Sequence, residues 1–366
     1  MDTASLNLST RGKMLNLILS SADGITKKEI FEEMGVSMPT VHKYMDELQE
    51  MGLICAGKAK PSTGGRRATG YVVNPMSRFS VGVAVTAGYH RFLALDLSGA
   101  ELAYKSIHNI FGTIEELAEN IDNELREFIS ENGLEMENLL GVCIAIPAIM
   151  NRKKEEFQLS PTMNLKNDSY APLMKLPYPV YIENDAVCAA SAQLPADDFV
   201  YLFLEQGVGG AICHNGRLFH GDNHKSAEFG HMCIVPGGKT CYCGKKGCLE
   251  TYVSSRRYKQ ELALDNDEFF MFLKRGDEAC RTLWDDILSY LAVGIHNLRV
   301  IFDCDIILGG FVAAQLPEYM DQLRARVSAL DPFDDDADFL YLAKKADRAN
   351  MEGAAHHFIR EFIEKV

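Results

Sequence analysis

The spacing of apolar residues predicts three short helices between residues 11 and 55. Thr26 and Glu29 fit the capping box, in which the threonine hydroxyl accepts an amide of the first turn and the glutamate returns to the threonine amide. Gly35 is expected to end this second helix, and Ser37 to cap the third. The three apolar stripes are Met14, Leu15, Leu17 and Ile18; Ile30, Phe31 and Met34; and Val41, Met45 and Leu48.

Two strand-like segments follow the helices, MGLICAGKAK at 51–60 and TGYVVNP at 69–75. The loop between them, PSTGGRR, is basic and contains two glycines. A helix, a turn ending in glycine and a second helix form the helix-turn-helix pattern. Together with the two strands, this pattern predicts a winged helix-turn-helix DNA-binding domain over residues 1–75.

Residues 76–366 have the pattern of an α/β domain. Two strand-turn-strand segments, 80–99 and 199–219, are each followed by helical patterns. Because each unit can form a sheet covered by helices, we expect two lobes with a cleft between them. The other predicted strands are 139–147, 179–184 and 305–311, and the predicted helices are 113–131, 185–193, 277–302 and 350–365. The long helix carries an apolar stripe of Leu283, Ile287, Leu291, Ile295 and Leu298.

Composition separates the two parts by charge. The chain of 366 residues is 47% hydrophobic and 24% charged, which is ordinary for a globular protein. Residues 1–75 hold nine Lys/Arg and eight Asp/Glu, whereas the remainder holds 28 and 43. The formal charge of −14 therefore belongs to the larger part, and the N-terminal part can approach phosphates.

The sequence also indicates the compartment. It has no run of about 18 apolar residues, so no membrane span is expected. The first residues, MDTASLNLSTRGK, lack the apolar core of a signal peptide. We therefore expect a cytoplasmic protein with reduced thiols, in which ten cysteines favour metal ligation over a disulfide framework.

The segment 231–248 predicts a metal site with the spacing H-x9-C-x-C-x4-C, formed by His231, Cys241, Cys243 and Cys248. Three thiolates and one imidazole suit tetrahedral zinc. Gly244 and Gly247 allow the backbone to fold back between the ligands. Four protein ligands leave no open position, so the predicted zinc is structural. A reduced cysteine cluster without metal is the alternative. Cys233 is expected to be a strand residue that packs into the core, with a role as a substitute ligand as the alternative.

These residues lie in motifs that resemble the ROK family of repressors and sugar kinases. The resemblance extends from about Arg11 to the C-terminal end, and it implies an actin-like (ribonuclease H-like) two-lobed fold for residues 76–366. Four stretches carry it: AEFGH (227–231) resembles the glutamate–glycine–histidine element, CYCGKKGCLE (241–250) the zinc signature, IENDA (182–186) the sugar-contacting motif and IILGG (306–310) the adenosine-site turn.

The resemblance implies a carbohydrate site in the cleft. Asp185 matches the family's base toward the sugar hydroxyl, and with Asn184 it is expected to hydrogen-bond the sugar. Glu228 and His231 are implied to face the sugar, with His231 shared with zinc, because a metal on one nitrogen orients the other. Asn164 in SPTMNL matches a further sugar contact. Helix capping is the alternative for Asn184 and Asp185.

Three departures from the kinase pattern argue against nucleotide. Residues 84–88, AVTAG, replace D-x-G-G-T and lack both the acid that organises Mg²⁺ and the glycines that admit phosphate. In the second turn, Glu205 puts a carboxylate where a phosphate would come. Phe311 stands in place of the third glycine of the adenosine turn. We therefore predict that the chain is not an enzyme.

The predicted third helix carries candidate DNA contacts. Thr40, His42 and Lys43 point away from its apolar stripe and are candidates for major-groove or phosphate contacts. Arg66 and Arg67 follow two glycines and can enter a narrow minor groove. A solvated helix face and a disordered linker are the alternatives. A single module offers too little contact for selectivity, so a homodimer or tetramer is expected.

The leading hypothesis is a sugar-responsive transcriptional repressor that binds operator DNA as a dimer and releases it when a sugar closes the lobes. An ATP-dependent sugar kinase with an appended DNA-binding domain is the rival hypothesis. A third hypothesis keeps the DNA-binding module but makes the large domain a protein-docking platform.

Overall fold

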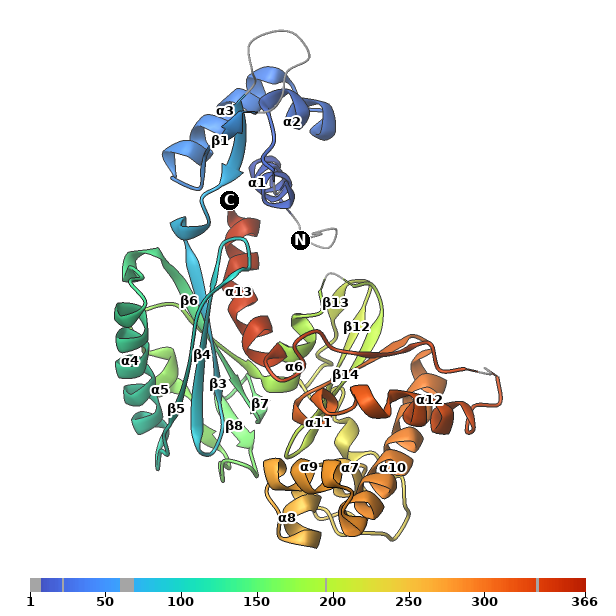
Figure 1. The fold of residues 1–366 in the computed structure, drawn as a ribbon. Helices are drawn as coiled ribbons and strands as arrows, with labels where there is room; N and C mark the ends of the chain where they lie inside the picture. Colours follow the sequence, from blue (N-terminus) through green and yellow to red (C-terminus); the bar gives the residue numbers. More distant parts are fainter. Residues whose placement is uncertain (1–7, 22, 60–68, 195, 334–335) are drawn as a thin grey trace. The chain divides into compact units, whose positions relative to one another are not determined.

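The structure, a computed structural model, contains two compact units joined by several crossings of the chain (Figure 1). It describes residues 8–21, 23–59, 69–194, 196–333 and 336–366. The first unit comprises Met1–Ile144, Pro172–Ile182 and Ala354–Val366, and the second comprises Ala145–Ala171 and Glu183–Gly353.

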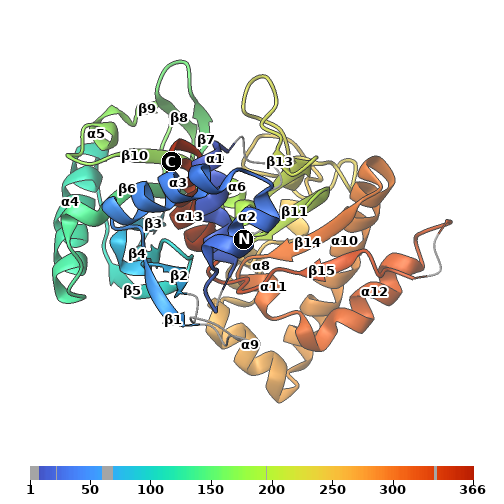
Figure 2. The same ribbon diagram turned by 90° about the horizontal axis from the view of Figure 1, so that it is seen from above.

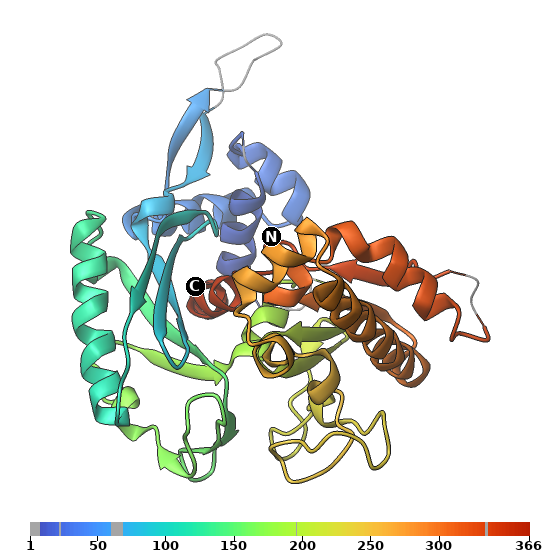
Figure 3. The same ribbon diagram turned by 60° about the horizontal axis from the view of Figure 1, so that its bottom comes forward.

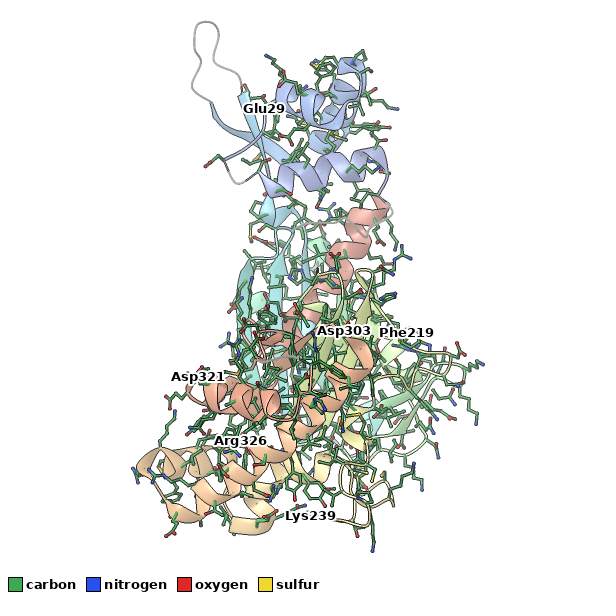
Figure 4. All side chains as sticks on the ribbon, turned by 90° about the vertical axis from the view of Figure 1, so that its right-hand side faces the viewer. Glu29, Phe219, Lys239, Asp303, Asp321 and Arg326 are labelled. Atoms are coloured by element: carbon green, nitrogen blue, oxygen red, sulfur yellow. The ribbon has the colours of Figure 1, made fainter. Side chains whose placement is uncertain are left out.

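The first unit begins with the predicted winged helix-turn-helix. Its elements are α1 (Thr10–Ser20), α2 (Lys27–Met34), α3 (Met38–Glu50), β1 (Ile54–Ala59) and β2 (Thr69–Val73), and the two strands are antiparallel. The capping box of α2 is present: Thr26 Oγ1 accepts from Glu29 N, and the Glu29 carboxylate, labelled in Figure 4, accepts from Thr26 N. Gly35 ends α2 with φ 62°.

Most of the predicted stripe residues form the core of this domain, whereas Leu17 and Met34 are only half-buried and Phe31 is exposed. Met14, Leu15 and Ile18 are buried, as are Ile30 and the three stripe residues of α3. Phe31 was expected in the stripe but is 40% exposed. Successive side chains on a helix point about 100° apart, so the rotation of α2 that buries Ile30 turns Phe31 toward solvent.

The rest of the first unit is a five-stranded sheet with strand order β10-β6-β3-β4-β5. The predicted hairpin is β3 paired antiparallel with β4. Helix α4 and residues 354–366 of α13 lie on opposite faces of this sheet (Figures 1–3). The bounds are β3 (Phe79–Val85), β4 (Tyr89–Asp96), β5 (Glu101–His108), α4 (Ile114–Glu131), β6 (Leu139–Ile146), α5 (Ala171–Met174), β10 (Val180–Asn184) and α13 (Ala349–Lys365).

The second unit contains a sheet of order β13-β12-β11-β14-β15 and a small sheet of order β7-β8-β9. The predicted second strand pair is β11 with β12, antiparallel, and β14 adds to β11 in parallel. The bounds are β7 (Ile149–Asn151), β8 (Glu156–Leu159), β9 (Asp168–Ser169), β11 (Phe199–Leu204), β12 (Val208–His214), β13 (Arg217–Leu218), β14 (Asp305–Gly309) and β15 (Leu340–Leu342).

Helices pack on this second sheet and on one another. Helix α6 lies on β11 and β12, and the long helix α10 contacts α12, α9 and α7. All five apolar residues predicted for the stripe of α10 are buried. The bounds are α6 (Asp185–Ser191), α7 (Glu250–Val253), α8 (Arg256–Leu262), α9 (Asn266–Arg275), α10 (Glu278–Phe302), α11 (Phe311–Ala314) and α12 (Met320–Ser328). None of the helices in the described residues is both long and apolar enough to cross a membrane.

Candidate functional site

The four predicted metal ligands converge in the second unit. Their donor atoms all lie within 4.8 Å of one another. Cys241 Sγ is 3.7 Å from His231 Nδ1, and Cys243 Sγ is 3.7 Å from Cys248 Sγ. Two thiolates on a tetrahedral zinc with bonds of about 2.3 Å are separated by about 3.8 Å. The donor set and its spacing therefore fit one tetrahedral ion.

The loop that carries the cysteines is shaped by backbone hydrogen bonds and by one glycine. Cys241 N donates to Lys245 O at 2.8 Å, which closes a tight turn between ligands. Gly247 has φ 83°, and a Cβ there would lie 1.8 Å from Val235 O. Lys239, labelled in Figure 4, ties the loop to α8 through an ion pair of 2.7 Å with Glu261.

Cys233 does not lie in the core as predicted. It is exposed, although its backbone pairs with that of Cys248 in an isolated bridge. The irregular loop replaces the expected strand, so the side chain faces outward. All ten cysteines of the chain are free thiols in the structure.

The imidazole of His231 has two distinct sides. Its Nδ1 faces Cys241, whereas its Nε2 lies 3.1 Å from Tyr242 Oη. Burial, together with the charge of Lys245, lowers the pKa of His231. The ring is therefore kept neutral, as a metal ligand must be.

Two carboxylates, Glu250 and Asp185, lie close enough to Glu228 to raise its pKa. Burial, and then the charges of Glu250 and Asp185, raise the pKa of Glu228 to about 7. Burial raises the pKa of Asp185 to about 6. Burial also raises the pKa of Glu250, although that carboxylate accepts a hydrogen bond of 3.1 Å from Val208 N. These groups form a partly desolvated set of hydrogen-bond acceptors.

Close packing of α6 on β12 brings Asp185 to this set. A Cβ on Gly209 would lie only 2.8 Å from Ala186 Cβ, so a larger residue on β12 would push the start of α6 away. Asp185 is the first residue of α6, and its Oδ1 accepts from Ala186 N at 2.9 Å.

Asn184 is the N-cap of α6, as the capping alternative states. Its Oδ1 accepts from Ala186 N and Val187 N, and its Nδ2 donates to Ala148 O at 3.3 Å. Asn164 is exposed and has φ 54°, in the turn between Ser160 and Leu165. The structure places it in the second unit with the other four predicted sugar residues, and its role stays a prediction.

Sequence reasoning missed Glu250 and Tyr242. Glu250 is only 4% exposed and begins α7 directly after the metal loop. Its signal in the sequence was the final letter of CYCGKKGCLE, an acid that directly follows the apolar Leu249. Tyr242 carried no signal of its own, because the residue between two metal ligands is usually free to vary in type.

The three residues expected to exclude nucleotide, Glu205, Phe311 and Ala84, each have defined contacts within one unit. In the second unit, Glu205 Oε1 accepts from Phe311 N at 2.8 Å, so the carboxylate already engages the amide at the start of α11. Phe311 packs edge-on against Phe270 with ring centroids 5.8 Å apart. In the first unit, Ala84 is a buried residue of β3 paired with Arg91 of β4.

The predicted DNA-contacting side chains of α3 lie near its N-terminus. Thr40 Oγ1 is 2.8 Å from Ser37 Oγ, and His42 Nδ1 is 3.1 Å from Lys27 Nζ. Lys43 is exposed and lies 3.9 Å from Glu47 in a loose ion pair. The two arginines predicted to enter the minor groove, Arg66 and Arg67, lie outside the described residues.

Comparison with known families assigns both parts of the chain. The pattern of the ROK family matches residues 81–361, and that of a winged helix-turn-helix DNA-binding family matches residues 8–54. The chain belongs to the ROK family. The predicted combination of a winged helix-turn-helix with an actin-like ROK domain is thereby confirmed.

Two bacterial regulators are similar to this ROK chain over much of its length. The xylose repressor of Bacillus subtilis (strain 168) is 24% identical over 319 residues, which are 83% of each chain. The DNA-binding transcriptional dual regulator NagC of Escherichia coli (strain K12) is 25% identical over 246 residues, which are 65% of this chain and 61% of NagC.

Solved structures share the fold. A ROK family transcriptional regulator, a homologue of the E. coli MLC protein, superimposes with a TM-score of 0.77 and 21% identity over 97% of this chain and 96% of its own. A ROK family glucokinase from Streptomyces griseus, in complex with glucose and AMPPNP, gives a TM-score of 0.63 and 20% identity over 76% and 98%. The fold is thus shared with regulators and with kinases.

Proposed function

We propose that this chain is a transcriptional repressor that binds operator DNA through residues 1–75 and a carbohydrate effector through residues 76–366. The observation that carries the proposal is the joining of a winged helix-turn-helix to a ROK domain, aligned over 83% of both chains with a xylose repressor. A bacterial repressor binds its operator DNA in the cytoplasm, so we propose a cytoplasmic location for this protein.

The proposed sugar contacts are Asn164, Asn184, Asp185, Glu228 and His231. Sugars present many hydroxyl donors, and the carboxylates of Asp185, Glu228 and the adjacent Glu250 are acceptors close to one another. Their raised pKa values indicate partial removal from water, where a hydrogen bond to a ligand contributes more than in solvent. Asn184 keeps one role as a helix cap, so its contact would use the amide nitrogen.

We further propose that the chain does not turn over ATP. Glu205 supports this, because its carboxylate holds the Phe311 amide and repels a phosphate at the same position. Ala84 supports it independently, because an alanine side chain cannot organise Mg²⁺.

Zinc is the ion that best fits the four-residue cluster. His231, Cys241, Cys243 and Cys248 would hold it through one nitrogen and three sulfurs. Bound zinc would hold the loop together and fix the His231 ring. Because all four positions are taken by protein, the ion would have no part in a reaction.

The proposed response requires two conformations that bind sugar unequally. In a dimer, a sugar-dependent change within each chain would alter the spacing of two winged domains on paired half-sites and weaken operator binding. Repression relieved by sugar follows from this arrangement.

Footprinting of DNA upstream of sugar-catabolic genes, with and without a panel of sugars, tests the proposal. A protected site that is lost with one sugar class supports it, and protection indifferent to every sugar contradicts it. A coupled ADP-release assay with the hexoses of this panel tests the rival kinase hypothesis. ADP release above the rate without protein would overturn the proposed lack of catalysis.

A further inference from the structure

Tyr242 has an unusual position between two metal ligands. Cys241 and Cys243 flank it in the chain, yet its side chain points to His231 and is 43% exposed. The two rings meet edge to face, with centroids 5.3 Å apart and an angle of 76°. Arg256 covers the phenol ring, with its guanidinium carbon 5.4 Å from the ring centroid. The ring is therefore held in place from two sides.

The hydroxyl of Tyr242 engages the side of His231 that faces away from the thiolates. Because Nδ1 is turned to Cys241, the proton of the neutral imidazole belongs on Nε2, and Nε2–H donates to Tyr242 Oη at 3.1 Å. Burial, and then the charge of the nearby Glu250, raise the pKa of Tyr242, so this carboxylate lies close to the phenol. Glu250 in turn accepts from Val208 N.

The hydroxyl of Tyr242 therefore lies between the metal cluster and the neighbourhood of Glu250. It engages the one imidazole nitrogen that the metal would leave available. A sugar hydroxyl could bind this nitrogen only by displacing Tyr242 Oη.

We infer that Tyr242 is a specificity-determining residue of the proposed sugar site, on whose existence this inference rests. Its hydroxyl occupies the His231 nitrogen that a sugar hydroxyl would otherwise bind, so the site selects against sugars that need this nitrogen. His231 is thereby removed from the direct sugar contacts proposed above, and the selected effector is a carbohydrate whose hydroxyls are bound by the carboxylates of Asp185 and Glu228.

Isothermal titration calorimetry of the full chain with free pentoses, free hexoses, N-acetylhexosamines and sugar phosphates tests the inference. Tyr242→Phe keeps the ring but leaves Nε2–H without its phenol partner. At least one sugar that wild type binds weakly or not at all is expected to bind about fivefold more tightly to the variant, as one added hydrogen bond provides. The ranking of sugars therefore changes.

Two controls separate this effect from damage to the fold. Tyr341→Phe removes a hydroxyl from an exposed tyrosine of β15 in the same unit and is expected to keep the wild-type ranking. Zinc content and the unfolding midpoint without sugar report whether the metal loop is intact in each variant.

The outcomes distinguish this inference from the proposed function. If wild type binds a sugar and Tyr242→Phe keeps the same ranking, or weakens all sugars equally, the inference is overturned and the sugar site stands. If no sugar binds to wild type or to either variant, both are overturned. New or tighter binding by Tyr242→Phe alone supports the inference even where wild type binds no sugar.

Discussion

Asp185 is both the first residue of a helix and a proposed sugar contact. It is the first residue of α6, and it accepts a hydrogen bond from the next amide. It also lies near Glu228, whose pKa it helps to raise. Helix capping is already provided by Asn184. The helix therefore does not require a carboxylate at Asp185 for capping, which supports the proposed role in ligand binding.

Burial of Asp185 predicts a measurable dependence of stability on pH. Its pKa is raised from 3.8 to about 6, so between these values the folded chain retains a proton that the unfolded chain has lost. The free energy of unfolding of wild type, relative to Asp185→Asn, is therefore expected to fall as the pH rises from about 4 to 6 and to level off above.

Urea unfolding of both proteins across this pH range measures the difference. Glu228 is the neighbouring carboxylate and is present in both proteins. A difference that stays constant with pH, or that changes in the opposite direction, would contradict the burial of Asp185.

Single residues were predictable from the sequence where the signal was local. The cluster of possible metal ligands was found because four donors occur within 18 residues, and the capping box because Thr26 and Glu29 are three residues apart at the start of the helix. Glu250 was not assigned, because its burial depends on β12. Contacts between distant segments leave no periodic pattern in the chain.

At the scale of elements, the metal loop has little regular structure of its own. Backbone turns and two isolated bridges hold it, so a bound ion would supply much of its stability. Cys248 is a buried proposed ligand, and Cys233 is an exposed cysteine paired with it through the backbone. The two residues offer a matched pair for substitution.

Cys248→Ser is expected to abolish stoichiometric zinc binding and to lower the thermal unfolding midpoint. A loss of about 2 kcal/mol corresponds to about 4–8 °C in a domain of 150–250 residues. Cys233→Ser is expected to keep one zinc per chain and the wild-type midpoint. Metal analysis and scanning calorimetry check both, and equal zinc content in the two variants would refute the ligand assignment.

Helix α3 gives a prediction for DNA binding. Lys43 is exposed and only loosely paired, so it is available to a phosphate. Lys43→Ala is expected to weaken binding to all DNA sequences about equally and to reduce the slope of log affinity against log salt by about 1.

Lys153→Ala is the matched control, because it removes an exposed lysine from the second unit. Salt-dependent anisotropy titrations measure both variants. An unchanged slope for Lys43→Ala, or an equal change in the control, would contradict the assignment of α3 as the DNA-contacting helix.

Long periodic elements were predicted well, and short ones were missed. The stripe of α10 extends over 25 residues, and its five predicted residues are all buried. The three strands of the β7-β8-β9 sheet have two to four residues each, too few for alternation to be visible. Strand β15 is equally short and is specified by pairing with β14.

At the scale of the whole molecule, the chain combines a DNA-binding domain with a fold that is also found in sugar kinases. A xylose repressor is similar to the chain over 83% of its length, and Glu205 holds the amide of Phe311. We therefore propose that sugar binding changes the DNA affinity of this protein without a chemical reaction.

The most direct test is the affinity of the full chain for a footprinted operator, measured by fluorescence anisotropy with and without the sugar that releases it. The account predicts at least tenfold weaker binding with sugar for wild type, a factor that corresponds to about 1.4 kcal/mol of coupling. Asp185→Asn is expected to bind the operator normally and to lose the sugar response. Equal operator affinity with and without every sugar, or an undiminished response in Asp185→Asn, would contradict it.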